Sequence, residues 1–230
     1  MTTDLDICFS QAFQENLNKH SPETDDEELK RYVKERICCA VKTLNSIGNT
    51  IKIEKIYLDV DCKYERIKIY FDESAPKYEI ACLKVPPQII ILPSPPFFSP
   101  GNLIQTFDSL KNCCRRNPFS HRNLCHEFGH LQDAQRSGFD YEPPNKKLNP
   151  YVDVIWNILL ESGFSKHGMA LENKDKNLEY FRLKLKMLWI EPTIKDFERL
   201  WRKRNYNYEE IRELAQEYFS SSKKAKRIRG

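Results

Sequence analysis

The chain has 230 residues, of which 40% are hydrophobic, 12% aromatic and 30% charged, and its formal net charge is +4. This composition supplies enough apolar side chains for a folded core and excludes a disordered or a collagen-like chain. No apolar run approaches the roughly 20 residues that a membrane-spanning helix needs, and the acidic N-terminus lacks the apolar centre of a secretory signal. We therefore expect a cytoplasmic protein with no membrane partner.

The positive charge is concentrated at the C-terminus. Residues 223–230 contain five lysines and arginines and no acidic residue, and the rest of the chain is close to neutral. We expect one domain over residues 1–222, followed by a disordered basic tail over residues 223–230. A tail of this kind is also typical of a weak contact with nucleic acid.

The first half of the chain predicts one helix and a small sheet. For residues 1–25, which are polar, we expect a loose or weakly helical segment. Apolar residues recur at helical spacing over residues 25–47, after an acidic start and before a glycine, and predict an N-terminal helix. The spacing then changes to a period of two, which predicts strands over residues 51–60, 66–71, 77–85 and 88–92.

The second half predicts mainly helices. A helix is expected to start at Asn117-Pro118 and to end before Gly138, and a second one to start at Asn149-Pro150, because asparagine followed by proline is a common helix start. Three further helices are predicted over residues 178–190, 192–203 and 208–219. The fold class is therefore α+β, with an N-terminal helix, a small mixed sheet and a C-terminal helical half.

The eight cysteines do not follow a metal-binding pattern, because no two of them are separated by two residues as in a C-x-x-C motif. Without a secretory signal, disulfide bonds are not expected. We therefore expect reduced thiols that contribute to packing.

Residues 126–130 read His-Glu-Phe-Gly-His, an HExxH pattern inside the first of the later helices. Positions i and i+4 of a helix lie on one face, so the imidazoles of His126 and His130 can bind one metal ion. Glu127 lies near the open coordination position, where it can accept a proton from the attacking water. The opposite face of this helix is apolar and is expected to face the core. The pattern predicts a zinc site with Glu127 as the general base.

The helix that begins at Asn149 is apolar on nearly all sides, which is typical of a buried helix. Asp153, Asn157 and Glu161 interrupt it at a spacing of four residues and form one stripe. Two unpaired buried carboxylates would destabilise the fold, whereas a divalent cation facing the stripe would satisfy them. The stripe is therefore the expected source of the third protein ligand that a two-histidine zinc site needs.

These two features together resemble the zincin metallopeptidases of the gluzincin kind, over roughly residues 50–167. The resemblance implies a zincin-like fold, zinc held by His126 and His130, a glutamate ligand from a downstream helix, and Glu127 as general base. It also implies a peptide or protein substrate. The remainder of the chain matches no pattern of that family.

The resemblance leaves two alignments open for the third ligand. ImmA/IrrE-type proteases carry Glu-x-x-Ala-Asn, which aligns Asp153 as the ligand and Asn157 as its support. Another group of zincin-like proteins carries Trp-Asn-x-Ala-x-Asp, which aligns Trp156, Asn157 and Glu161. We favour Glu161 as the ligand and Asn157 as its support, because glutamate reaches further and the Trp-Asn pair is matched.

We expect a zinc-dependent hydrolase, a cytoplasmic metallopeptidase in which Glu127 activates the attacking water. The candidates for stabilising the oxyanion are Tyr141, Tyr151 and His167. The alternative is a regulatory or nucleic-acid-associated protein that uses a zincin scaffold. Aromatic side chains among cations favour this alternative, because such rings can stack on bases; they occur together at Arg199, Trp201, Arg202, Lys203, Arg204, Tyr206 and Tyr208.

Overall fold

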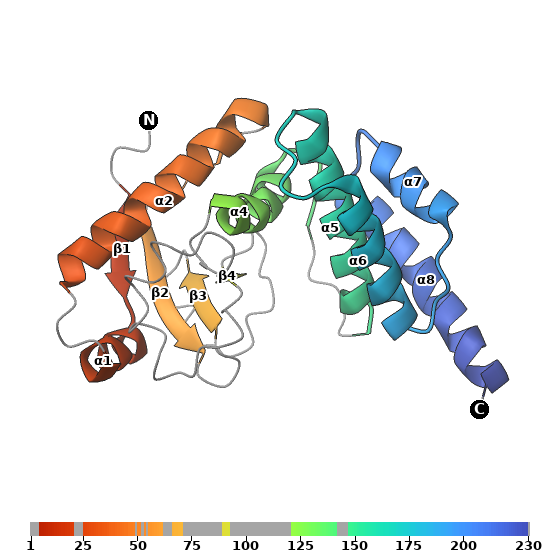
Figure 1. Cartoon of the computed structure of the whole chain (residues 1–230), viewed down its shortest axis with the longest axis horizontal. Coiled ribbons are helices and arrows are strands. Elements are labelled where there is room, and N and C mark those ends of the chain that lie inside the picture. Colours follow the sequence, from red (N-terminus) through yellow and green to blue (C-terminus); the bar gives the residue numbers. More distant parts are fainter. Residues whose placement is uncertain are drawn as a thin grey trace. The chain divides into compact units, whose positions relative to one another are not determined.

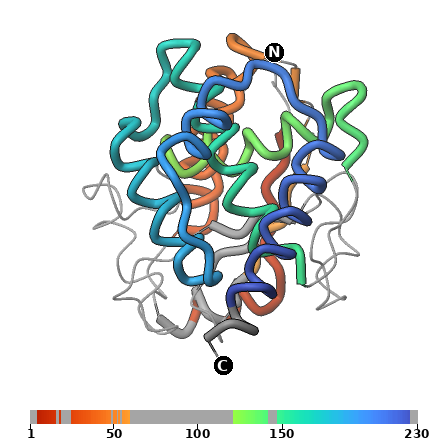
Figure 2. Tube along the Cα trace, turned by 90° about the vertical axis from the view of Figure 1, so that its right-hand side faces the viewer, coloured from red at the N-terminus to blue at the C-terminus, as the bar shows by residue number. Residues whose placement is uncertain are grey.

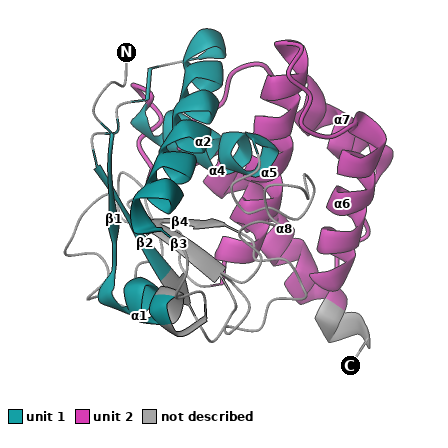
Figure 3. Ribbon diagram, turned by 60° about the vertical axis from the view of Figure 1, so that its left-hand side comes forward, with its two compact units in different colours: residues 1–135 teal, residues 136–230 magenta. Residues whose placement is uncertain are grey.

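The fold was analysed in a computed structural model of the chain. It describes residues 5–20, 25–48, 50, 51, 53, 55–61, 66–70, 89–92, 121–141 and 147–229. The chain divides into two compact units, Met1–Gln135 and Arg136–Gly230, which are coloured separately in Figure 3. We refer to them as unit 1 and unit 2. The sequence predicts a single domain over residues 1–222.

Unit 1 contains a four-stranded mixed sheet in the order β1-β2-β3-β4 (Figure 1). β1 pairs in parallel with β2, whereas β2 pairs antiparallel with β3, and β3 antiparallel with β4. A parallel pair needs a crossover, and the two helices α1 and α2 lie in the connection between β1 and β2. The strands are β1 Asp6–Phe9, β2 Lys55–Asp61, β3 Arg66–Tyr70 and β4 Ile89–Leu92.

The helix α2, Asp26–Ile47, confirms the N-terminal helix that the periodicity predicts. The side chain of Asp25 caps it by accepting hydrogen bonds from the backbone N–H groups of Glu27 and Glu28, at 2.8 and 3.3 Å. Its apolar face is buried, and the helix packs against β1 and against α4, His121–Gln135. The fold of unit 1 therefore holds α4, the helix that carries the HExxH pattern.

The N-terminal segment was expected to be loose or weakly helical; its helix agrees with that expectation, whereas its strand was not expected. It forms β1 and the helix α1, Gln11–His20, and the side chains of Leu5 and Ile7 are buried. A four-residue strand has little sequence signal of its own, because its stability comes from pairing with β2.

Unit 2 is a bundle of four helices, shown in Figure 1 and from another side in Figure 2. α5 packs against each of the other three, which explains why it is apolar on nearly all sides. The bounds are α5 Asn149–Lys166, α6 Lys174–Met187, α7 Ile194–Arg202 and α8 Tyr208–Arg229.

The last helix runs further than expected. We predicted a helix over residues 208–219 and a disordered tail over residues 223–230, but α8 continues to Arg229. Near the end of α8, Ser222 is buried and donates a hydrogen bond from Oγ to the carbonyl oxygen of Leu188 at 2.6 Å.

Together, the units give an α+β protein with a small sheet and a mainly helical second half. The expected strand over residues 77–85 and the expected helix start at Asn117-Pro118 lie outside the described residues. None of the helices in the described part of the chain is long and apolar enough to cross a membrane.

Candidate functional site

The three residues of the HExxH pattern lie on α4, within unit 1. Leu124, Phe128 and Leu131 form the buried face of this helix, as its apolar pattern predicts. His126, Glu127 and His130 are only partly exposed and share the other side. The pattern is therefore helical, and its polar residues are partly buried.

His126 and His130 have the geometry of a pair that can share one metal ion. Their ring centroids are 5.1 Å apart, and the rings meet edge-on at 88°. Two imidazoles bound tetrahedrally to one zinc ion at ~2.0–2.1 Å would have ring centres roughly 5 Å apart. The observed separation is close to this value.

Two contacts with α2 hold α4 in place. Gln132 donates from Nε2 to the carbonyl oxygen of Leu44 at 2.9 Å, next to the end of α2. At the start of α4, Nε2 of His121 lies 3.4 Å from Oγ1 of Thr43 and 3.5 Å from Sγ of Cys125. The side chain of His121 therefore contacts α2, and we do not expect it to bind the metal ion with His126 and His130.

The thiol of Cys125, next to the first motif histidine, belongs to the core. Burial raises its pKa to about 12, and the charge of nearby Cys39 acts in the same direction. The neutral thiol is a weak nucleophile, because the thiolate is the reactive form. Cys125 thus packs α4, as expected for a reduced cysteine.

The three polar positions of α5, in unit 2, differ in exposure. Asp153 is exposed, Asn157 is half-buried, and Glu161 is buried at 5% exposure. The expectation that both carboxylates of the stripe are buried is therefore wrong for Asp153, which lies near the N-terminal end of α5 on its open edge. Asn157 donates from Nδ2 to Oη of Tyr180 on α6 at 2.9 Å, so a packing contact within unit 2 orients its amide.

Within the described residues, no group of three or more histidine, cysteine, aspartate or glutamate side chains gathers as a metal site would require. Unit 1 supplies two imidazoles, and the candidates for the third ligand lie in unit 2. Zinc binding and the identity of the third ligand are therefore proposals.

Trp156, which one alignment of the third ligand uses, lies in an aromatic core. Its ring centre is 5.2 Å from that of Phe139, 5.5 Å from that of Tyr141 and 6.1 Å from that of Tyr208. The backbone N–H of Tyr208 donates to the carbonyl oxygen of Phe139 at 3.1 Å, which joins the start of α8 to this cluster. The packing of unit 2 thus accounts for this tryptophan.

The expected oxyanion-stabilising candidates have different surroundings. Tyr141 and Tyr151 are buried, Tyr141 in the aromatic core and Tyr151 with its ring centre 5.8 Å from that of Phe219. His167 is exposed at the C-terminal end of α5, where its backbone N–H caps the helix.

The cluster of aromatic residues and cations around α7 also contributes to packing. The guanidinium of Arg136 lies 5.0 Å from the ring centre of Tyr206 and donates a hydrogen bond to its carbonyl oxygen at 2.6 Å. Trp201 stacks on Phe197 at 5.4 Å. Lys203 pairs with Glu210 at 2.9 Å, so the pKa of that carboxyl lies below its usual value.

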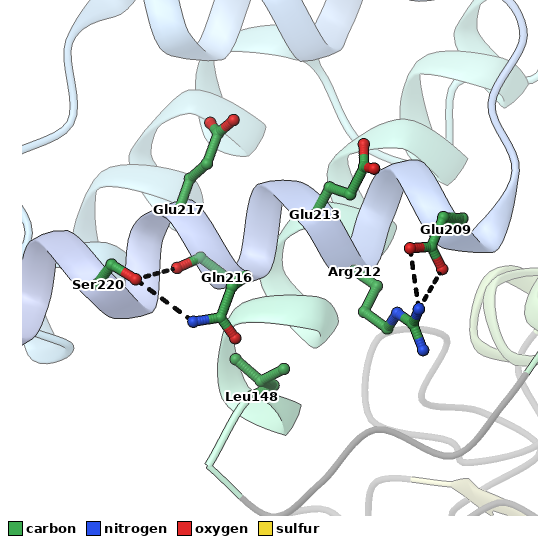
Figure 4. Close-up of a pocket in the computed structure, with 7 residues that line it drawn as sticks. All are labelled: Leu148, Glu209, Arg212, Glu213, Gln216, Glu217 and Ser220. Atoms are coloured by element: carbon green, nitrogen blue, oxygen red, sulfur yellow. Dashed lines mark hydrogen bonds and ion pairs between the residues drawn. The ribbon is translucent and has the colours of Figure 1, made fainter.

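A groove of about 720 Å³ runs along α8, lined by the start of α5 and the outer face of α8 (Figure 4). Three of its seven lining residues are glutamates, Glu209, Glu213 and Glu217, and Arg212 pairs with Glu209 at 2.6 Å. Glutamates repel phosphates, so we do not expect a nucleic acid to bind in this groove.

Sequence reasoning missed one surface feature of unit 2. Leu183, Met187, Trp189 and Ile194 are exposed large hydrophobic residues at the end of α6 and the start of α7. The sequence contains a pattern that could have indicated this surface, because Leu183 and Met187 are four residues apart in a lysine-rich helix. The spacing of apolar residues alone predicts only the helix.

Comparison with protein-family models, with curated proteins and with solved structures found no match to this chain.

Proposed function

We propose that the protein is a zinc-dependent hydrolase, a metallopeptidase with a zincin-like fold that acts on a peptide or protein substrate. The observation that supports this proposal most is the geometry of His126 and His130 on α4, whose ring centroids are 5.1 Å apart with Glu127 between them in sequence. A histidine pair on a helix with a glutamate after the first histidine is the pattern of zinc hydrolases.

In this proposal, His126 and His130 bind the metal through one ring nitrogen each. When bound, zinc supplies Lewis-acid polarisation of the scissile carbonyl and acidifies the attacking water. Glu127 accepts the proton of that water and passes it to the leaving amine. The hydrogen bond from Gln132 to Leu44 joins α4, the helix that carries these side chains, to α2.

Glu161 is proposed as the third ligand and Asn157 as its support. Exposure favours Glu161 over Asp153, because a buried carboxylate needs compensation by a cation or by hydrogen bonds, whereas an exposed one is satisfied by water. The hydrogen bond from Asn157 to Tyr180 fixes the amide one turn before Glu161 on α5.

Elemental analysis tests the metal centre. We expect about one zinc per chain in protein purified without chelator, and loss of this zinc in His130→Ala. His121→Ala is the matched control. It also removes a histidine from α4, but this histidine contacts α2 and is not an expected metal ligand. A protein without stoichiometric metal, or equal metal loss in both variants, would contradict the proposal.

Hydrolysis of a mixture of fluorogenic peptides tests the role of Glu127. Glu127→Gln keeps the size of the side chain but removes the base, so zinc content should remain while hydrolysis falls by roughly 10²-fold or more. A variant that retains its zinc and cleaves as fast as the wild type would refute this role.

A further inference from the structure

Four large apolar side chains lie on the surface of unit 2, at the end of α6 and in the turn that leads to α7. Leu183, Met187, Trp189 and Ile194 are 61, 67, 49 and 54% exposed. Leu183 and Met187 are four residues apart and thus lie on the same side of α6, while Met187 and Trp189 line one shallow hollow. We call these four residues the apolar patch.

The turn after α6 holds Trp189 at the surface. Its φ is 66°, in the left-handed region that side chains other than glycine rarely adopt. The N–H of Trp189 donates to the carbonyl of Lys186 at 3.0 Å, and the N–H of Ile190 to that of Leu185 at 2.9 Å, as in a Schellman motif. Glycine is the usual residue at this position. A half-exposed indole here therefore points to a role outside the fold.

Cations accompany the apolar patch. The segment 182–195 contains four lysines and arginines and one acidic residue. Lys184, Lys186 and Lys195 are exposed, and Glu191 lies 3.7 Å from Lys186. Glu179, one turn before Leu183 on α6, is also exposed, so the apolar patch is bordered by acidic residues as well as by a small excess of lysines and arginines. It fits an occupant that is both apolar and anionic.

We propose that the apolar patch and its lysines dock unit 2 onto an anionic lipid surface. Protruding apolar side chains can enter the acyl boundary of a bilayer, tryptophan favours the headgroup level, and lysines bind the anionic headgroups. This proposal is independent of the zinc site on α4, and it departs from the expectation, drawn from the sequence, that the protein has no membrane partner.

The other occupants fit the observations less well. The hollow beside Met187 and Trp189 measures about 300 Å³, which has room for a few side chains and not for a partner helix. In a two-fold dimer through the apolar patch, the lysines of one copy would face those of the other and repel them. A bilayer needs neither a groove nor an opposite surface of protein.

Sedimentation with lipid vesicles tests the proposal on the full chain. We expect binding to vesicles of phosphatidylcholine and phosphatidylserine, weaker binding in high salt, and little binding to phosphatidylcholine alone. Replacing Leu183 and Met187 together by alanine should lower the binding constant by about tenfold or more, because two exposed apolar side chains are lost. Lys184→Gln should lower it by about fivefold.

Matched variants make the result specific. Lys174 and Lys176 lie on the same helix at its other end and pair with Glu198 and Glu172, so replacing both by glutamine should leave binding nearly unchanged. Binding should also shift the fluorescence of Trp189 to the blue, and Trp189→Phe should lose this shift. Unchanged melting curves show that the variants fold.

Three outcomes would overturn the proposal. The first is no binding to the anionic vesicles. The second is equal binding by the wild type and by the variant without Leu183 and Met187, which would assign the contact to other cations such as residues 223–230. The third is a dimer in sedimentation equilibrium that this variant abolishes, which would assign the apolar patch to a second copy of the chain.

Discussion

Substituting the three polar positions of α5 one at a time identifies the third ligand. Asp153→Ala should change the free energy of unfolding by no more than about 0.5 kcal/mol, because the side chain is exposed. Asn157→Ala removes the 2.9 Å hydrogen bond to Tyr180 and should cost about 1 kcal/mol. Glu161→Gln keeps the buried volume and removes a buried charge, so the metal-free variant should be about as stable as the wild type.

With zinc present, we expect the three variants to rank differently in stability. Zinc at about 100 times its dissociation constant should stabilise the wild type by about 2.7 kcal/mol. Glu161→Gln should lose most of this gain, Asn157→Ala should bind zinc ~10–100-fold more weakly as a supporting residue, and Asp153→Ala should behave as the wild type. The assay is urea unfolding with and without zinc, combined with chelator competition.

Tyr180→Phe provides the control for Asn157. It removes the same hydrogen bond and leaves the amide in place, so an effect of Asn157→Ala through packing alone would appear in both variants. If Asp153→Ala loses the zinc-dependent stabilisation and Glu161→Gln retains it, the reasoning from burial is wrong and the alignment that uses Asp153 is correct.

Two further predictions concern α8. Deleting residues 223–230 should lower the free energy of unfolding by less than about 1 kcal/mol. Ser222 keeps its hydrogen bond to Leu188, and only surface contacts such as that of Lys223 with Phe219 are lost. A large fall in melting temperature would contradict this prediction. Burial raises the pKa of Tyr218 to about 12, helped by the charge of Asp196, so its ionisation favours the unfolded chain as pH rises from 10 to 12. Tyr218→Phe should therefore lose less stability than the wild type over that range, and equal losses would refute the assignment.

The HExxH helix shows how far local pattern reaches. Its helical form, its buried face and the proximity of His126 and His130 all follow from the spacing of residues on one helix, and the structure has each of them. Asp133, three residues after His130 on the same helix, is buried. Burial of a polar residue depends on the segments that pack over it, so a periodicity within α4 could not reveal it.

The stripe on α5 shows the limit of the same reasoning. The spacing of Asp153, Asn157 and Glu161 correctly predicts that they lie on one side of the helix. It also predicts that all three are equally buried, which they are not. Their exposures differ because the neighbouring helices of unit 2 cover the stripe unevenly. Which carboxylate is buried depends on these neighbours, and no interval along the chain encodes it.

By itself, the sequence determined the α+β class, the helix over residues 25–47 and the histidine pair, because each depends on contacts between residues a few positions apart. The tertiary structure alone decided the pairing of β1 with β2 and the exposure of Trp189. Both depend on segments that are distant in sequence or on a single backbone conformation, and the free energy of such contacts appears only when the chain has folded.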